Sequence, residues 1–225
     1  MIKEFEDNGY ESGINLGGLS YDFRRNPNAD FSRNLRKIVK MYYEVNKRKC
    51  TLIAYKYGGL MTLHSIASNK KYYETYVENI ILISVPFGGQ YSSIYEMETD
   101  AVLDSNIPSL LIYNGKKVLR DWESTLFSYL NHKHPEMNNV IYQKDTSSYT
   151  YVEFMKSLHP DIIEIIENNN LKYDKIFEYM SNNNQIKLAC VTGKSTTFST
   201  PGSVSVSSQV FSYNRIDGDG LTDIK

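Results

Sequence analysis

Apolar residues recur at spacings of three and four between positions 31 and 46. The repeating residues are Leu35, Ile38, Val39, Tyr42 and Tyr43. Such a spacing places them along one stripe of a helix, while Arg33, Lys37 and Lys40 fall outside the stripe. We therefore predict an amphipathic helix over this segment, with its apolar side turned toward a core.

Three shorter segments are nearly continuous in apolar residues and predict buried strands. They are Cys50–Ala54, Asn79–Val85 and Lys187–Thr192. A helix-like stretch, Gly59–Ile66, separates the first two. Strand, helix and strand in this order indicate a parallel sheet with crossover helices, which is an α/β architecture.

The pattern weakens beyond residue 100. Short helices are predicted over Val152–Leu158, Asp161–Glu167 and Tyr173–Met180. The Asn168–Asn170 run lies between the last two, and asparagine runs favour turns and helix ends. The Ser/Thr-rich stretch 195–208 alternates weakly, so either a hairpin or an irregular loop would fit it.

The composition of the chain restricts the classes of protein to which it can belong. The chain has 225 residues, 41% hydrophobic and 23% charged, which suits one domain with a buried core and argues against wholesale disorder. A net charge of -1 provides no general attraction for nucleic acid or anionic membrane. No apolar run reaches the roughly 20 residues of a membrane helix, and Met1–Asp7 lacks the apolar stretch of a secretory signal. Cys50 and Cys190 are predicted to be free, buried thiols.

The segment Leu52–Leu60 carries the most specific chemical signal. An apolar strand runs into a turn of small residues and then directly into a helix, which is the setting of a nucleophile elbow. Small residues are needed beside the centre of that turn because strand and helix pack closely there, and Ala54 and Gly58 meet the need. Lys56 occupies the central position that a serine takes in the G-x-S-x-G pattern.

Three other segments fit around the elbow in a recognisable order. They are Tyr21–Arg24 (Tyr-Asp-Phe-Arg) upstream, Pro86–Gly89 (Pro-Phe-Gly-Gly) downstream, and Asp217–Gly220 (Asp-Gly-Asp-Gly) near the end of the chain. Together with the elbow they closely resemble the lecithin:cholesterol acyltransferase family, which includes the lysosomal phospholipase A2 type and the phospholipid:diacylglycerol acyltransferases. The resemblance spans nearly the whole chain.

The resemblance implies an α/β-hydrolase-like fold over residues 1–225, with a cap at about residues 90–170. It implies acyl transfer from a phospholipid to a sterol, another lipid hydroxyl or water, at a membrane or lipoprotein surface. By position, Lys56 takes the nucleophile slot, the Tyr57 backbone N–H takes an oxyanion-donor slot, and Asp219 takes the triad-acid slot. No cofactor, metal or nucleic acid is implied. Family members are often secreted or lumenal, and the compartment of this chain stays open.

Three departures from the family pattern change the expectation. A protonated lysine has no lone pair for attack, and an attack by the neutral amine would leave a stable amide. The family's histidine follows the acid, whereas His64, His132, His134 and His159 all precede Asp219. The family's first apolar strand, which supplies the second oxyanion N–H, would lie before Met1. We therefore expect a chain truncated at both ends relative to the family pattern, without serine-type turnover.

The sequence leaves two classes of function open. One is an acyltransferase-like enzyme of lipid metabolism, and the other is a non-catalytic relic that binds lipid or protein. In either case Lys56 could pair with Asp219 as a structural contact, since a half-buried lysine needs a partner. An incomplete sheet would also leave an exposed edge through which the chain could self-associate.

Overall fold

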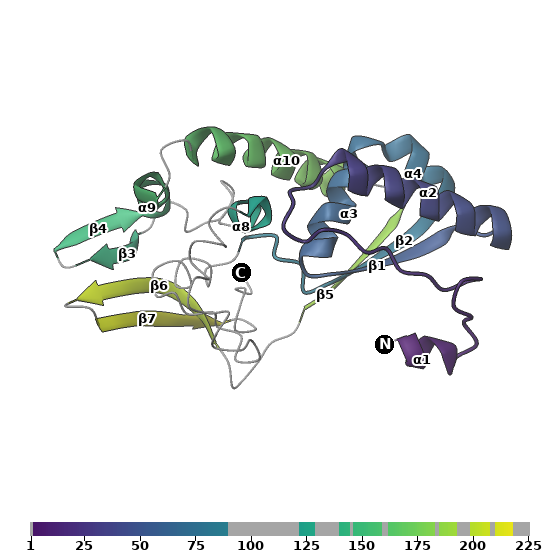
Figure 1. Cartoon of the computed structure of the whole chain (residues 1–225), viewed down its shortest axis with the longest axis horizontal. Helices are drawn as coiled ribbons and strands as arrows, with labels where there is room; N and C mark the ends of the chain where they lie inside the picture. Colours follow the sequence, from purple (N-terminus) through teal and green to yellow (C-terminus); the bar gives the residue numbers. More distant parts are fainter. Residues whose placement is uncertain are drawn as a thin grey trace. The chain divides into compact units, whose positions relative to one another are not determined.

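The computed structural model describes residues 2–89, 122–128, 140–144, 146–158, 162–182, 185–192, 199–207 and 210–217 (Figure 1). The helices are α1 (Ile2–Glu6), α2 (Ala29–Asn46), α3 (Tyr57–Ser68), α4 (Lys70–Tyr76), α8 (Glu123–Phe127), α9 (Tyr151–Leu158) and α10 (Ile162–Asn182). The strands are β1 (Cys50–Tyr55), β2 (Val77–Ile83), β3 (Val140–Lys144), β4 (Ser147–Thr150), β5 (Lys187–Val191), β6 (Ser199–Ser207) and β7 (Val210–Asp217). No described helix is both long and apolar enough to cross a membrane.

The chain divides into two compact units. Unit 1 comprises residues 1–23, 27–85 and 175–191, and unit 2 comprises residues 24–26, 86–174 and 192–225. Helix α10 contributes residues to both. The predicted cap at residues 90–170 stays a prediction, because much of that range lies outside the described residues.

A three-stranded parallel sheet forms the centre of unit 1, in the order β1-β2-β5. Its register sets Tyr55 beside Ile83 and Ile83 beside Val191, so the three strands end together. Carboxyl ends of parallel strands are where α/β folds place their sites. The predicted strands and the α/β class are thereby confirmed.

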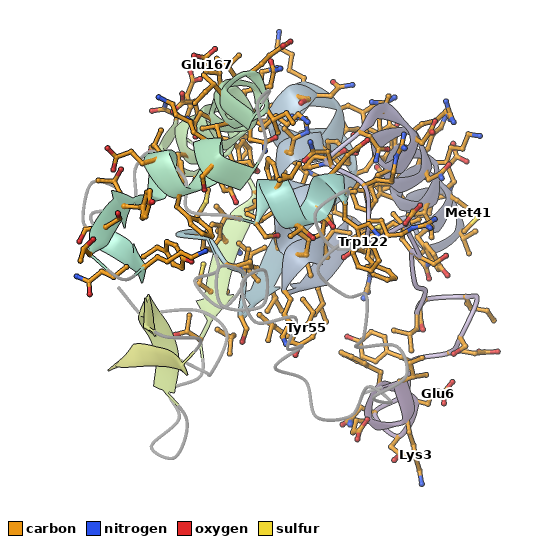
Figure 2. All side chains as sticks on the ribbon, turned by 60° about the vertical axis from the view of Figure 1, so that its left-hand side comes forward. Lys3, Glu6, Met41, Tyr55, Trp122 and Glu167 are labelled. Carbon is orange, nitrogen blue, oxygen red and sulfur yellow. The ribbon has the colours of Figure 1, made fainter. Side chains whose placement is uncertain are left out.

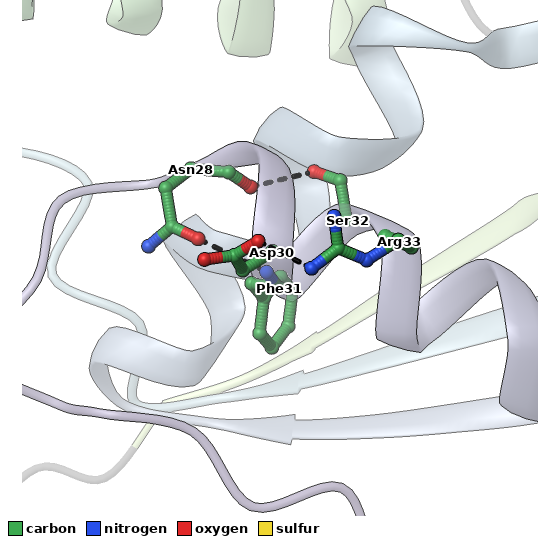
Figure 3. Close-up of polar contacts among 5 residues, drawn as sticks. All are labelled: Asn28, Asp30, Phe31, Ser32 and Arg33. Atoms are coloured by element: carbon green, nitrogen blue, oxygen red, sulfur yellow. Dashed lines mark hydrogen bonds and ion pairs between the residues drawn. The ribbon is translucent and has the colours of Figure 1, made fainter.

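Helices α2, α3 and α4 lie on one side of this sheet (Figure 1). Helix α2 begins at a clear cap, since the Asn28 side chain accepts a hydrogen bond from the Phe31 N–H at 3.0 Å (Figure 3). It ends at Lys47, whose left-handed backbone (φ 54°) directs its N–H to the Tyr43 carbonyl. Leu35 and Val39 are buried, which confirms the predicted amphipathic helix.

Helix α3 is buried on most of its surface, as expected for a helix that is apolar all round. Leu60, Leu63 and Ile66 are fully buried on it. The buried Ser65 hydroxyl shares a 2.6 Å hydrogen bond with the hydroxyl of Tyr73 from α4, which satisfies both polar groups inside the core. Helix α3 is therefore a rigid support for the turn that precedes it.

Described side chains on the opposite face of the sheet are only partly buried or exposed, which corrects the prediction of fully buried strands. Side chains alternate along β1 and β2, so Ala54 and Leu82 are buried whereas Ile53 is 41% and Tyr55 55% exposed. Figure 2 shows Tyr55 on the side of the sheet away from helices α2 to α4. Strand β5, at the sheet edge, is mostly exposed, and the prediction of a buried Cys190 was wrong for this reason. Cys50 is free and half-buried.

Unit 2 contains a second sheet in the order β4-β3-β6-β7. Strands β6 and β7 form an antiparallel pair, so the hairpin alternative holds for the Ser/Thr-rich stretch from Ser199 onward. Beside α8, the Tyr173 ring stacks on Phe127 at 4.6 Å between centroids, and its hydroxyl donates to the Phe127 carbonyl at 2.9 Å. These contacts form a small aromatic core.

The two helices predicted around the asparagine run form one continuous helix, α10. The cause is tertiary: Asn169 is buried, donates to the Leu126 carbonyl at 3.2 Å and accepts from the Asn26 side chain at 3.3 Å. Its amide is thus occupied by partners outside the helix and does not compete for the helix backbone. Propensity alone could not reveal these partners.

Candidate functional site

The turn between β1 and α3 has the strained backbone expected of a nucleophile elbow. Lys56, its central residue, has φ 47° and ψ -127°, a combination outside the regions that L-residues normally occupy. Its N–H donates to the Ile83 carbonyl at 2.9 Å, and its carbonyl accepts from the Gly59 N–H at 2.9 Å. One bond ties the turn to β2 and the other closes the first turn of α3, so the surrounding structure enforces the strain.

Glycines allow the close approach that this turn requires. A Cβ at Gly59 would overlap the side chain of Val85, which follows the end of β2. A Cβ at Gly58 would lie 3.3 Å from the Tyr21 hydroxyl oxygen, tighter than an ordinary contact. Both glycines are buried. The sequence signal for an elbow therefore corresponds to real backbone packing.

A second strained residue stands next to Lys56 across the sheet. Ser84 directly follows β2, has φ 50°, and donates its N–H to the Val191 carbonyl at 2.8 Å. Since Tyr55 pairs with Ile83, Lys56 and Ser84 are the next residues along the two strands. Strained non-glycine residues cluster at functional sites, and these two meet at the carboxyl end of the sheet.

The Lys56 side chain is partly exposed. Its ammonium nitrogen lies 5.4 Å from the centroid of the Tyr55 ring, within the range of a cation–π contact. Among the described residues it forms no ion pair with a carboxylate. Tyr57 follows as the first residue of α3, so its backbone occupies the position expected for an oxyanion donor. The roles of Lys56 and Tyr57 stay predictions.

Tyr21 is a site residue to which the family pattern assigned no predicted role. Its ring packs edge-on against Phe31 (5.5 Å between centroids) and at a tilt against Tyr57 (6.5 Å). Partial burial raises the pKa of its phenol, which keeps the hydroxyl protonated. The only signal in the sequence was its place at the start of the Tyr-Asp-Phe-Arg segment.

The remaining predicted residues are placed only in part. Asp219 lies outside the described residues, as do His132, His134 and His159, so its pairing with Lys56 stays a prediction. His64 lies on α3 and is partly buried, in agreement with its interpretation as a helical residue. In the part of the chain that the structure describes, no three His, Cys, Asp or Glu residues gather as metal ligands would.

The Pro-Phe-Gly-Gly segment forms a tight turn. The Gly89 N–H donates to the Pro86 carbonyl at 3.2 Å, and Gly89 has φ 102°, a conformation that favours glycine. The backbone conformation of this turn therefore explains why a glycine stands at position 89, the last residue of the motif.

Comparison with known proteins gives a consistent picture. The sequence model of the family described as "Lecithin:cholesterol acyltransferase" matches residues 1–200. Lecithin-cholesterol acyltransferase-like 4 of Arabidopsis thaliana is 28% identical over 129 residues, covering 56% of this chain and 22% of the relative. Lysosomal phospholipase A and acyltransferase of Canis lupus familiaris is 26% identical over 92 residues, covering 40% and 22%. Phospholipase A(1) LCAT3 of Arabidopsis thaliana is 32% identical over 91 residues, covering 40% and 20%. The matched region thus spans about a fifth of these relatives' length.

Proposed function

Because this chain belongs to the lecithin:cholesterol acyltransferase family, we propose that it binds phospholipid at the elbow without serine-type acyl transfer. The observation that carries the proposal is Lys56 at the strained centre of the turn between β1 and α3. In this family setting the central side chain meets the scissile ester. An ammonium there cannot attack, because its nitrogen has no free electron pair.

The surrounding groups support retention of lipid binding. Tyr57, proposed as the oxyanion donor, is the first residue of α3, and glycines pack closely around the turn. The names of relatives include phospholipase and acyltransferase, so the ligand class proposed for this chain is phospholipid, with sterol or acylglycerol as acceptor lipids in a catalytic member. The alternative is a relic that contacts only protein, and failure of the protein to bind lipid would favour it.

Exposed side chains on the sheet support contact with a lipid surface. Ile53 and Tyr55 project from β1 and Val191 from β5, and Val191 is 50% exposed. Burial of such apolar area in an interface is favourable by about 25 cal/mol per Å². Strand β1 also stands at the edge of the described sheet, so self-association through this edge is part of the proposal. Sedimentation velocity at increasing concentration would test the self-association separately.

The proposal is tested by following fatty acid release from phosphatidylcholine vesicles. We expect release by the purified protein to equal that of buffer and of the Lys56→Ala variant, while the protein co-sediments with the vesicles. Release that disappears both on heat denaturation and in Lys56→Ala would overturn the proposal in favour of a lysine-dependent enzyme. Failure to co-sediment would contradict the lipid-binding part.

A further inference from the structure

We propose that the Tyr21 hydroxyl and the Lys56 ammonium together hold the phosphodiester of a phospholipid headgroup at the elbow. This inference rests on the proposed function and names the part of the lipid that the site would recognise. Lys56 is the centre of the turn, and Tyr21 borders the same turn at Gly58, two residues further along.

The position of the Tyr21 hydroxyl depends on the absence of a side chain at Gly58. Its oxygen lies 3.3 Å from where a Cβ would stand, and two further ring atoms lie 3.7 and 3.8 Å away. Edge-on packing against Phe31 and contact with Tyr57 fix the ring from two other sides. The hydroxyl is thus directed to the first turn of α3 by rigid neighbours, which is how binding residues gain precision.

This hydroxyl is available to a ligand. It forms no hydrogen bond with any residue that the structure describes, although Tyr21 is half-buried. The hydroxyl is not one of the buried side-chain atoms without a partner in the described part of the chain, so solvent and a ligand atom can reach it. Because burial raises its pKa, the phenol stays neutral and acts as a donor over the physiological range. A donor suits an acceptor oxygen on the ligand.

Lys56 adds a positive charge to the site, and a neutral ester has no negative charge to complement it. Its ammonium rests near the Tyr55 ring and has no carboxylate partner in the described part of the chain. An ester carbonyl is neutral, whereas a phosphodiester carries one negative charge and two acceptor oxygens. A neutral donor and a cation at one turn therefore fit the phosphodiester better than the ester, since charge-assisted hydrogen bonds are about twice as strong as neutral ones.

Calorimetric titration with two monomeric lipids separates these groups. Dibutanoylphosphatidylcholine carries both esters and the phosphodiester, whereas dibutanoylglycerol carries only the esters. We expect the wild type to bind the first and to bind the second at least about tenfold more weakly. Tyr21→Phe should weaken binding of the phosphatidylcholine by about five- to tenfold, the effect of one hydrogen bond. Lys56→Met should weaken it by about tenfold or more.

Gly58→Ala provides an independent test, because its added Cβ displaces the hydroxyl without removing it. We expect it to weaken phosphatidylcholine binding, and to add little further loss in the Tyr21→Phe background, where no hydroxyl remains. Tyr10→Phe, which alters an exposed tyrosine, is the matched control and should bind like the wild type. Thermal unfolding of each variant shows whether it is folded.

The outcomes separate this inference from the proposed function. Equal wild-type affinity for the two lipids would overturn the phosphodiester assignment while leaving lipid binding intact. Unchanged affinity in folded Tyr21→Phe would overturn the role of Tyr21. Binding of neither lipid would contradict the proposed function as well.

Discussion

The side chain of Val85 fills the space that a Cβ at Gly59 would need. Gly59 is in the first turn of α3 and Val85 follows β2, so this contact presses the end of the central strand against the start of the helix. The strained turn at Lys56 directly precedes this helix. Close packing of Gly59 and Val85 therefore adds to the two backbone hydrogen bonds that hold the elbow in place.

Substitution of Gly59 by alanine should destabilise the fold by about 2 kcal/mol, because an overpacked core position forces its neighbours to shift. Urea unfolding followed by circular dichroism measures the change. The double variant Gly59→Ala with Val85→Ala should recover part of the loss. Gly18→Ala is the matched control, since a Cβ there meets nothing within 4 Å, and it should leave stability nearly unchanged. Equal stability of Gly59→Ala and Gly18→Ala would contradict the packing described here.

Replacement of Lys56 by glycine should stabilise the fold by about 1 kcal/mol. Glycine removes the steric cost of φ 47° and ψ -127°, which exceeds the extra chain entropy that it loses on folding. Lys47→Gly serves for comparison, because Lys47 has an ordinary left-handed backbone (φ 54°, ψ 27°) and should gain less. A Lys56→Gly variant less stable than the wild type in the same urea titration would mean that the turn is not strained.

Stability should fall as the pH rises from about 10 to 12. Burial raises the pKa of Tyr73 from 10.0 to about 12, so in this range the unfolded chain releases a proton that the folded chain retains. The same holds for Tyr179, whose pKa burial also raises to about 12. The stabilisation is complete below pH 10 and is lost as the pH approaches the folded value.

Urea unfolding at pH 9, 10 and 11 measures this dependence. Tyr73→Phe should lower stability at pH 9, because the Ser65 hydroxyl loses its 2.6 Å partner, and should reduce the decline above pH 10. Tyr10→Phe is the matched substitution at an exposed tyrosine. A decline in Tyr73→Phe as steep as in the wild type would show that Tyr73 does not contribute to it.

In unit 2, Asn169→Ala should cost about 1–3 kcal/mol, because it removes two part-buried hydrogen bonds, the one to the Leu126 carbonyl and the one from the Asn26 amide. The control is Asn168→Ala at the preceding exposed position, which should be nearly neutral. Thermal unfolding followed by circular dichroism compares the two. Similar midpoints for both variants would contradict the buried amide contacts.

Local sequence patterns predicted those features of the fold and the site that depend on residues close together along the chain. The stripe from Leu35 to Tyr43 indicated α2, and the small residues around Lys56 indicated the elbow. Other features depend on partners far apart in sequence. The partners of Asn169 keep α10 continuous across an asparagine run, and one face of the sheet carries exposed side chains although its strands are apolar. The approach of Tyr21 to Gly58, 37 positions away, left no local pattern that could predict it.

A crystal structure with dibutanoylphosphatidylcholine tests most directly whether the elbow at Lys56 holds the phosphodiester and leaves the esters intact. We expect a phosphodiester oxygen at hydrogen-bond distance, about 2.7–3.2 Å, from both Lys56 Nζ and Tyr21 Oη, with both esters intact. An acyl carbonyl at the elbow with the phosphodiester elsewhere, or an acyl group attached to Lys56, would contradict it.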